Sequence, residues 1–335
     1  MLQNVNGILS LKELGSLFSY SFLLGLWLFG LGVLLGYLLR WWSGDQLLPV
    51  RLMSYLMPWL LIILIPALIL AGMTHHKWLF ITLLIPTLLI TMTYAPLFVT
   101  CFKTDNVGLT PVRIMSYNVW RENRDMHAVT EVILKEQPDI LLLQELKPAR
   151  ADRLTAALVN LYSDAKLHFI YEPKMLQGVI SRYPITSLGA FPKKGQAQKV
   201  SINTPDGPIT VFNIHPPKQS GWSRRYRQIS ALLEEEIATT EGPVILGGDF
   251  NATEQTQTYR MVNRYLGNAH REAGCGFGFT YPASMCIFKG KVLIPPLVRI
   301  DHIFYNKYFF PANARTLKES GGSDHFPVVA EFLRR

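Results

Sequence analysis

Six short clusters of polar residues each follow a run of aliphatic or β-branched residues, and each cluster offers carboxylate, amide or imidazole groups. They lie at residues 116–120, 144–145, 213–216, 248–251, 299–302 and 322–328. Hard divalent cations such as Mg²⁺ take oxygen ligands, and carboxylates or imidazoles held in place can move protons. Together these groups are the set required to hold a divalent cation and to cleave a phosphate ester.

Glu145 and Asn118 are the predicted metal ligands. Glu145 ends the aliphatic run 140–143, where a carboxylate buried without a partner is strongly unfavourable, so a cation should accompany it. Asn118 brings a neutral oxygen ligand of the hard type. Each residue also has a simpler interpretation, because Glu145 could pair with Lys147 or Arg150 and Asn118 could only form a turn.

Asp249 and Asn251 lie two residues apart after a run whose glycines let the backbone approach a ligand closely. Asp249 can orient or deprotonate water there, and Asn251 can hold that water or a phosphate oxygen. His215 follows another strand-like run and precedes two prolines that fix the loop, so its imidazole could donate to a phosphate oxygen. The alternatives are a plain turn at 249–251 and a structural role for His215.

Asp301, Asp324 and His325 complete the candidate site. A carboxylate hydrogen-bonded to an imidazole fixes the imidazole tautomer and raises its basicity. His325 can then stabilise the charge that builds on phosphorus, and Asp324 adds a ligand near the metal. His302 is excluded, because successive residues of a strand point to opposite faces.

The elements that must position these residues alternate between strands and helices from about residue 109 onward. Runs at 112–116, 140–143, 209–214, 244–246, 298–304 and 328–332 predict strands. Amphipathic runs at 125–137, 149–162, 223–240 and 256–266 predict helices. Residues 109–335 are therefore expected to form one catalytic domain that is large enough to bury a core.

Residues 1–108 are expected to form a membrane anchor. Three apolar runs, at about 17–39, 52–71 and 78–99, contain no Asp, Glu, Lys or Arg and are long enough to cross a bilayer. The first run is longer than the apolar part of a cleaved signal peptide. The alternative is a buried helical core in a soluble protein. Because no acidic residue or lysine lies inside the runs, an anchor is favoured over a transporter.

The bulk composition favours anionic partners and a membrane location. The formal net charge is +9 and the pI is near 9.4, which suits a membrane surface, a nucleic acid or a phosphorylated substrate, although it could serve solubility alone. The expected location is a multi-pass protein of the cell membrane, here a bacterial inner membrane. Lysine and arginine counts do not decide the side of the catalytic domain. A disulfide between Cys275 and Cys286 would favour the extracytoplasmic side, and free thiols are the alternative.

The clusters resemble those of the endonuclease/exonuclease/phosphatase superfamily, the DNase I-like group, over about residues 112 to 333. Gly-Asp-Phe-Asn at 248–251 and Ser-Asp-His at 323–325 are the most specific parts. The resemblance implies an α+β fold, a four-layer α/β/β/α sandwich. It also implies roles for eight residues: Mg²⁺ binding by Asn118 and Glu145 with Asp324 beside the metal, phosphate contact by His215, handling of water by Asp249 and Asn251, and pairing of Asp301 with His325. The chain looks most like bacterial membrane-anchored members.

Three functions follow as hypotheses. The leading one is a membrane-anchored phosphoester hydrolase that uses Mg²⁺, or Mn²⁺ as a substitute, on a lipid-linked substrate such as a phospholipid. The loop 277–297, rich in aromatic, aliphatic and lysine residues, could dip into the bilayer or fold on its own domain. The second is a membrane-tethered nuclease that grips phosphates through Arg224, Arg225 and Arg227. The third is a non-catalytic interaction protein. The oligomeric state is left open.

Overall fold

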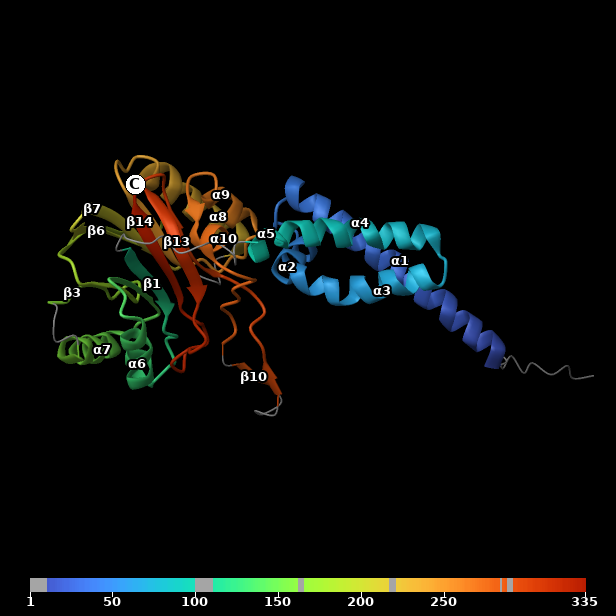
Figure 1. The fold of residues 1–335 in the computed structure, drawn as a ribbon, viewed down its shortest axis with the longest axis horizontal. Helices are drawn as coiled ribbons and strands as arrows, with labels where there is room; N and C mark the ends of the chain where they lie inside the picture. Colours follow the sequence, from blue (N-terminus) through green and yellow to red (C-terminus); the bar gives the residue numbers. More distant parts are fainter. Residues whose placement is uncertain (1–10, 100–110, 162–165, 217–220, 284, 288–291) are drawn as a thin grey trace, which may run out of the picture. The chain divides into compact units, whose positions relative to one another are not determined.

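The computed structural model describes residues 11–99, 111–161, 166–216, 221–283, 285–287 and 292–335. The chain divides into a helical unit, Met1–Thr93, and a sandwich unit, Tyr94–Arg335. Figure 1 draws both units as a ribbon coloured by residue number, from blue at the N-terminus to red at the C-terminus. The boundary expected between residues 108 and 109 lies outside the described residues.

The helical unit contains three helical stretches that are apolar and long enough to cross a membrane: Ser16–Trp42, Leu48–Met73 and Lys77–Tyr94. The first belongs to α1 (Leu11–Trp42) and the third is α4 (Lys77–Tyr94). The second joins α2 (Leu48–Leu56), a 3₁₀ turn (Met57–Leu60) and α3 (Leu61–Met73). Large apolar side chains remain exposed along these helices, among them Phe18 at 73% and Ile62 at 64%, as expected for surfaces that face lipid.

The third apolar run ends earlier than expected. The sequence pattern runs to residue 99, but α4 stops at Tyr94 and a separate short helix, α5 (Pro96–Val99), follows within the sandwich unit. Pro96 causes the break, because proline disfavours helical geometry in the residue before it and has no amide hydrogen to donate.

The sandwich unit contains two six-stranded mixed sheets. In sheet order, the first holds β13 (Phe309–Thr316), β14 (Val328–Arg334), β1 (Val112–Asn118), β2 (Ile140–Gln144), β4 (Gln177–Ser181) and β3 (His168–Glu172). The second holds β5 (Ile185–Phe191), β6 (Ala197–Thr204), β7 (Gly207–Ile214), β8 (Val244–Asp249), β12 (Asp301–Tyr305) and β9 (Gly267–Asn268). A hairpin of β10 (Met285–Ile287) and β11 (Val292–Ile294) stands apart from both.

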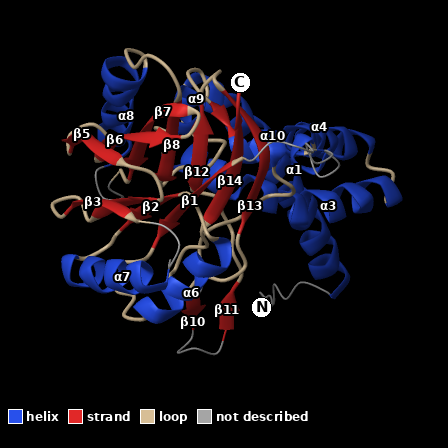
Figure 2. Ribbon diagram, turned by 60° about the vertical axis from the view of Figure 1, so that its left-hand side comes forward, coloured by secondary structure: helices blue, strands red, loops and turns tan. Residues whose placement is uncertain are grey.

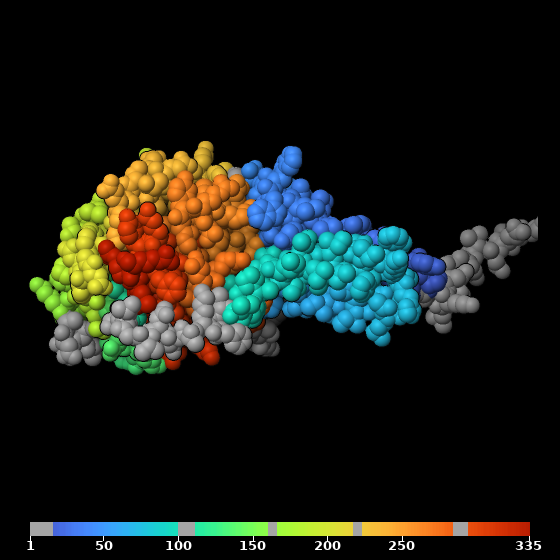
Figure 3. Space-filling view, turned by 45° about the horizontal axis from the view of Figure 1, so that its top comes forward, coloured from blue at the N-terminus to red at the C-terminus, as the bar shows by residue number. Residues whose placement is uncertain are grey.

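Helices cover the outer faces of the sheets, which gives the expected four layers (Figure 2). An apolar core of Ile, Val and Leu side chains lies between the sheets, and two further clusters pack the helices on the outside. The helices are α6 (Met126–Glu136), α7 (Pro148–Leu161), α8 (Gly221–Leu232), a π-helical turn (Leu233–Ile237), α9 (Gln257–Val262) and α10 (Ala269–Ala273). α10 packs against β13. In the space-filling view, an orange surface lies beside the red surface of the C-terminal residues (Figure 3). The predicted α/β/β/α sandwich is thus confirmed.

Strand direction places the polar clusters at one edge of the sandwich. β1 and β2 run parallel, as do β7 and β8, so their carboxyl ends lie at the same edges of their sheets. β12 runs antiparallel to β8, and its first residue, Asp301, lies opposite Asp249. A Cβ atom at Gly248 would lie 2.0 Å from the carbonyl oxygen of Ile214, so only glycine permits this close approach of β8 to β7.

Candidate active site

Asp249 lies at the centre of the candidate site. It ends β8 and its side chain is fully buried. Its Oδ2 accepts a hydrogen bond from Asn118 Nδ2 at 3.0 Å and lies 3.6 Å from His215 Nε2 and 3.8 Å from His325 Nε2. Its Oδ1 accepts from the backbone nitrogen of Asn251 at 2.8 Å. The turn proposed as the plain alternative is therefore present, but it occupies one carboxylate oxygen and leaves the other facing the site.

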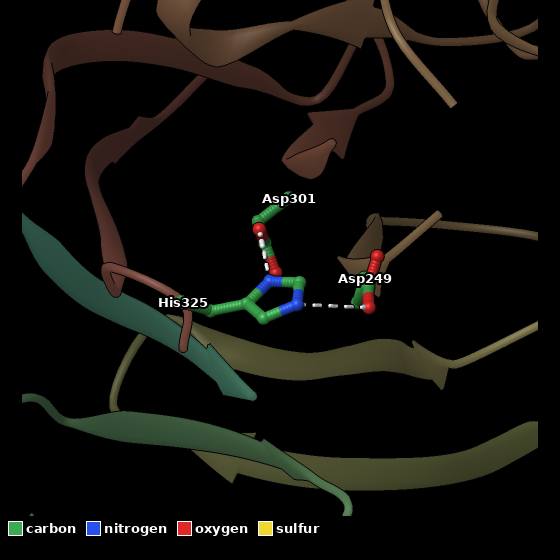
Figure 4. A group of neighbouring side chains, drawn as sticks. All are labelled: Asp249, Asp301 and His325. Atoms are coloured by element: carbon green, nitrogen blue, oxygen red, sulfur yellow. Dashed lines mark hydrogen bonds and ion pairs between the residues drawn. The ribbon is translucent and has the colours of Figure 1, made fainter. Parts of the chain in front are cut away.

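Asp301 and His325 form the buried pair that the resemblance implies. His325 Nδ1 lies 2.9 Å from Asp301 Oδ2, and each side chain is 1% exposed (Figure 4). Burial alone would lower the pKa of His325, but the carboxylates of Asp301 and Asp249 outweigh burial and raise that pKa to about 9. The imidazole is therefore held as a cation at neutral pH, with Nε2 directed toward Asp249.

The loop that carries His325 is fixed to the end of β1. Ser323 Oγ donates to the backbone oxygen of Asn118 at 2.6 Å and accepts from the backbone nitrogen of His325 at 3.1 Å. Asp324 lies beside the imidazole, with Oδ1 4.0 Å from His325 Nε2, and its own carbonyl accepts from Ala283 at 2.7 Å. The side chain of Asp324 is 23% exposed, so it lies at the rim of the site.

Glu145 follows β2 in a left-handed backbone conformation, with φ of 58°. Its Oε2 accepts from the backbone nitrogen of Arg121 at 3.0 Å, and its Oε1 lies 3.5 Å from both His215 Nε2 and Asn118 Nδ2. Burial alone would raise the pKa of Glu145, but the Arg121 amide and the His215 imidazole outweigh it and lower the pKa. The carboxylate therefore stays ionised.

The alternative partners of Glu145 are engaged elsewhere. Lys147 pairs with Glu122 at 3.2 Å, and Arg150 donates to the backbone oxygen of Arg121. Arg121 is the basic neighbour of Glu145 instead, with Nε 3.5 Å from Oε2 and a side chain that is 58% exposed. Arg121 was not among the residues predicted from the sequence. Its place three residues after Asn118 in the sequence is the feature that could have suggested it.

Asn251 and Arg225 form the side of the site next to α8. Asn251 has a φ of 50° and donates from Nδ2 to the carbonyl of Pro216 at 3.1 Å. Arg225 donates to the backbone oxygen of Asn251 at 2.5 Å, whereas Arg224 and Arg227 are exposed. Of the three arginines singled out in the sequence, Arg225 is therefore the one that contacts a site residue directly in the part of the chain that the structure describes.

His302 lies outside the site, as expected from strand alternation. Its Nε2 donates to the carbonyl of Ala252 at 2.9 Å, and its ring packs against Phe250 and Tyr259 on the helix side of β12. Burial, with a smaller contribution from Arg299, lowers the pKa of His302 to about 3. The imidazole is therefore a neutral structural group.

The residues present fit a hard divalent cation. Carboxylate oxygens of Asp249 and Asp301 gather within 4.8 Å of each other around the imidazole of His325. The ionised Glu145 contacts His215 and Asn118, the same two side chains that face Asp249. His325 Nε2 is buried and has no hydrogen-bond partner among the described residues. The amide oxygen of Asn118 accepts from Trp120 at 3.0 Å, and its nitrogen faces the carboxylates. For Asn118 to act as an oxygen ligand, its carboxamide must rotate so that the oxygen and nitrogen exchange places. That role stays a prediction.

Two contacts beside the buried pair of Asp301 and His325 could not be predicted from the sequence. Thr280 Oγ1 accepts from the backbone nitrogens of Ile300 and Asp301, at 3.1 and 3.4 Å. The ring of Tyr281 lies 4.9 Å from that of His325. Both residues belong to the loop expected to dip into a bilayer, and this part of the loop packs on the sandwich unit. Residues 284 and 288–291 of this loop lie outside the described residues.

Comparison with known proteins identifies the family. The model of the Endonuclease/Exonuclease/phosphatase family matches residues 115–325, and the chain belongs to this family. No match is found among the curated proteins.

Solved structures show the same fold. An endonuclease/exonuclease/phosphatase family protein from Bacteroides thetaiotaomicron superposes with a TM-score of 0.53 at 18% identity, covering 67% of this chain and 95% of its own. A mannosyl-6-phosphatase from the same organism gives 0.52 at 18% identity, covering 66% of this chain and 99% of its own. A humanized D. rerio TDP2 gives 0.52 at 16% identity, covering 67% and 99%.

Proposed function

We propose that this protein is a membrane-anchored phosphoester hydrolase that depends on Mg²⁺, with Mn²⁺ as a substitute. The observation that carries the proposal is the convergence of Glu145, Asp249, Asp301, His215 and His325 at one edge of the sandwich. Membership of a family that includes phosphatases and nucleases supports it. A non-catalytic role is disfavoured, because buried charges gathered this closely destabilise a fold that has no use for them.

The residues divide the reaction between them. Glu145 and Asn118, with Asp324 at the rim, would hold the cation, which polarises the phosphoryl oxygens when bound. Asp249 would orient and deprotonate the attacking water, assisted by the Asn251 amide. His215 would donate a hydrogen bond to a phosphoryl oxygen. His325, oriented by Asp301, would stabilise the negative charge that develops as water attacks in line with the leaving group.

The substrate that we propose is a lipid-linked phosphate or phosphodiester. The three apolar helices would fix the site at the bilayer, where the concentration of such a substrate is high. The competing proposal is a tethered nuclease, favoured by the exposed Arg224 and Arg227 on the helix whose Arg225 contacts Asn251.

Turnover by the full-length protein in lipid nanodiscs tests these proposals together. Phospholipid in the disc, single-stranded DNA, duplex DNA and bis(p-nitrophenyl) phosphate are offered separately with Mg²⁺ or chelator. The lipid proposal expects the highest kcat/KM on phospholipid, and the nuclease proposal expects it on DNA. If no phosphate ester is hydrolysed, including the small soluble diester, the protein is not this kind of enzyme. His325→Ala serves as the inactive control.

We further propose that the sandwich unit faces the extracytoplasmic side of a bacterial inner membrane. Cys275 is disulfide-bonded, which fits an oxidising compartment. Its pairing with Cys286 stays a prediction, because the side chain of Cys286 lies outside the described residues. A reporter that is active in one compartment, fused after Arg335, tests the side. A signal from a cytoplasm-specific reporter would contradict the proposal.

A further inference from the structure

The apolar core between the sheets gives way to a layer of amides at the site end. Gln144, Gln177, Gln198 and Asn213 are each 0% exposed. Each lies two residues from a core residue of the same strand, respectively Leu142, Val179, Val200 and Val211. Residues two apart in a strand share a face, so all four amides point into the space between the sheets. We call these four residues the amide layer.

Gln144 joins three strands that lead to the site. Its Nε2 donates to Asn213 Oδ1 on β7 at 2.8 Å and lies 3.2 Å from Ser116 Oγ on β1. The residue itself ends β2 and directly precedes Glu145. Ser116 and Asn213 each lie two residues before a site residue, Asn118 and His215. One carboxamide thus connects the strand ends that carry three site residues.

Asn213 makes the reciprocal connection from the second sheet to the first. Its Nδ2 lies 3.0 Å from the backbone oxygen of Leu143 on β2 and 3.1 Å from that of Gly178 on β4. Both carbonyls belong to the opposite sheet. Hydrogen bonds between stacked sheets have a fixed direction and length, whereas the apolar contacts of the rest of the core permit sliding.

The candidate site needs that fixed spacing because it is divided between the sheets. Asn118 ends β1 and Glu145 follows β2 in the first sheet, whereas Asp249 ends β8 and His215 follows β7 in the second. Their closest contacts are a few ångströms long, such as 3.5 Å between Glu145 Oε1 and His215 Nε2. A small shift of one sheet against the other would separate the groups that must act on one phosphate.

We propose that Gln144 and Asn213 are positioning residues, and that their bond between the sheets sets the distance of Glu145 and Asn118 from His215 and Asp249. The inference rests on the proposed function where metal affinity is measured, and on the fold alone where hydrogen exchange is measured. Gln177 provides a matched control, because it lies in the same layer with the same burial and its amide has no hydrogen-bond partner among the described residues.

The test compares three variants of the full-length protein in nanodiscs: Gln144→Met, Asn213→Leu and Gln177→Met. Calorimetry measures Mn²⁺ affinity without any substrate, and hydrogen exchange with mass spectrometry measures the peptides that contain residues 144–146 and 213–215. We expect Gln144→Met and Asn213→Leu each to weaken Mn²⁺ binding by ~10-fold or more, the range known for groups that orient metal ligands. Both should speed exchange at the two strand ends, and Gln177→Met should change neither quantity.

A milder variant covers the case in which Gln144→Met does not fold. Gln144→Asn keeps an amide but shortens the side chain by one methylene, so the bond to Asn213 is lost with little change in polarity. Wild-type exchange at 213–215 in folded Gln144→Asn would overturn the proposal, and so would equal effects in Gln177→Met. These outcomes are read without turnover, so they are distinct from failure of the proposed hydrolase activity, which would show as an inactive wild-type protein.

Discussion

Asp249 and Asp301 lie opposite each other on the antiparallel strands β8 and β12, and the imidazole of His325 lies between their carboxylates. Nδ1 of His325 is 2.9 Å from Asp301, and Nε2 is 3.8 Å from Asp249. Two buried carboxylates so close together repel each other unless a cation separates them. The imidazolium of His325 supplies that positive charge. The protonation state of His325 therefore depends on carboxylates from both strands.

Asp301 and His325 should therefore behave as one unit in catalysis. We expect Asp301→Ala and His325→Ala each to lower kcat on a soluble phosphodiester by ~10²–10⁴-fold, the span of a positioned acid–base group. The double variant should be little worse than either single one, because groups that act together give non-additive losses. Circular dichroism must first show that the variants fold. Additive losses in folded variants would show that Asp301 acts independently of the imidazole.

Substitution of Glu145 should lower the affinity for metal, whereas substitution of Asp249 should lower the catalytic rate. Glu145→Ala should weaken Mn²⁺ binding measured by calorimetry, because it removes an ionised ligand. Asp249→Asn should lower kcat at saturating Mn²⁺, because it removes the candidate base. Excess chelator should abolish turnover by the wild type. Equal Mn²⁺ affinity in wild type and Glu145→Ala would remove Glu145 from the ligand set.

His302 should make the fold sensitive to mild acid. Its pKa is lowered to about 3 in the folded protein, whereas an unfolded histidine titrates near 6.5. The stability that it contributes is present above about pH 6.5 and is lost as the pH falls toward 3, because the unfolded chain binds the proton first. Between pH 7 and pH 5 we expect a loss of about 2 kcal/mol.

Thermal unfolding of the detergent-solubilised protein at several pH values measures this loss. His302→Gln should unfold at a lower temperature at pH 7, because the buried site is disturbed, but its unfolding temperature should fall less between pH 7 and pH 5. Parallel curves for wild type and variant would show that another group causes the acid sensitivity.

The segment 94–99 should stabilise the sandwich unit when the preceding helices are removed. Leu97 is 1% exposed, its carbonyl accepts from Gly276 at 2.9 Å, and the ring of Phe98 lies 5.2 Å from that of Phe277. Burial of one leucine contributes about 1.5–3 kcal/mol. A chain that begins at Tyr94 should therefore unfold several degrees higher, about 3–10 °C, than a chain that begins at Leu109. Equal unfolding temperatures would show that the segment does not support the fold.

The elements that bear the site followed from sequence, and several others did not. β1, β2, β7, β8 and β14 are buried on one or both faces, so their aliphatic runs are nearly continuous and predict strands. β5 is an edge strand with exposed residues, and β13 contains a bulge between Pro311 and Asn313, so neither has a regular pattern. The expected strand 298–304 begins only at Asp301. Leu297 and Val298, which precede it, pair with the loop at Thr280 and Tyr281 instead.

The proximity of the site residues was predictable because parallel strands end at a common edge, but their partners were not. Asn118 was expected to present oxygen and presents nitrogen to the carboxylates. For Glu145 the alternative to metal binding was a pair with Lys147 or Arg150, and its basic neighbour is Arg121 instead. Such choices depend on side-chain directions within a few ångströms, and spacing along the chain does not determine them.

The pairing of β1 with β14 has a consequence for biosynthesis. Val112 lies opposite Phe332, so the first strand of the sandwich stays without one neighbour until β14 has been made. At the usual rate of translation this delay is on the order of 10–40 seconds. By then the apolar helices have long since left the ribosome. A nascent chain that has not reached residue 325 therefore lacks both the β14 neighbour of β1 and His325, so the proposed site is completed only after the apolar helices have been made.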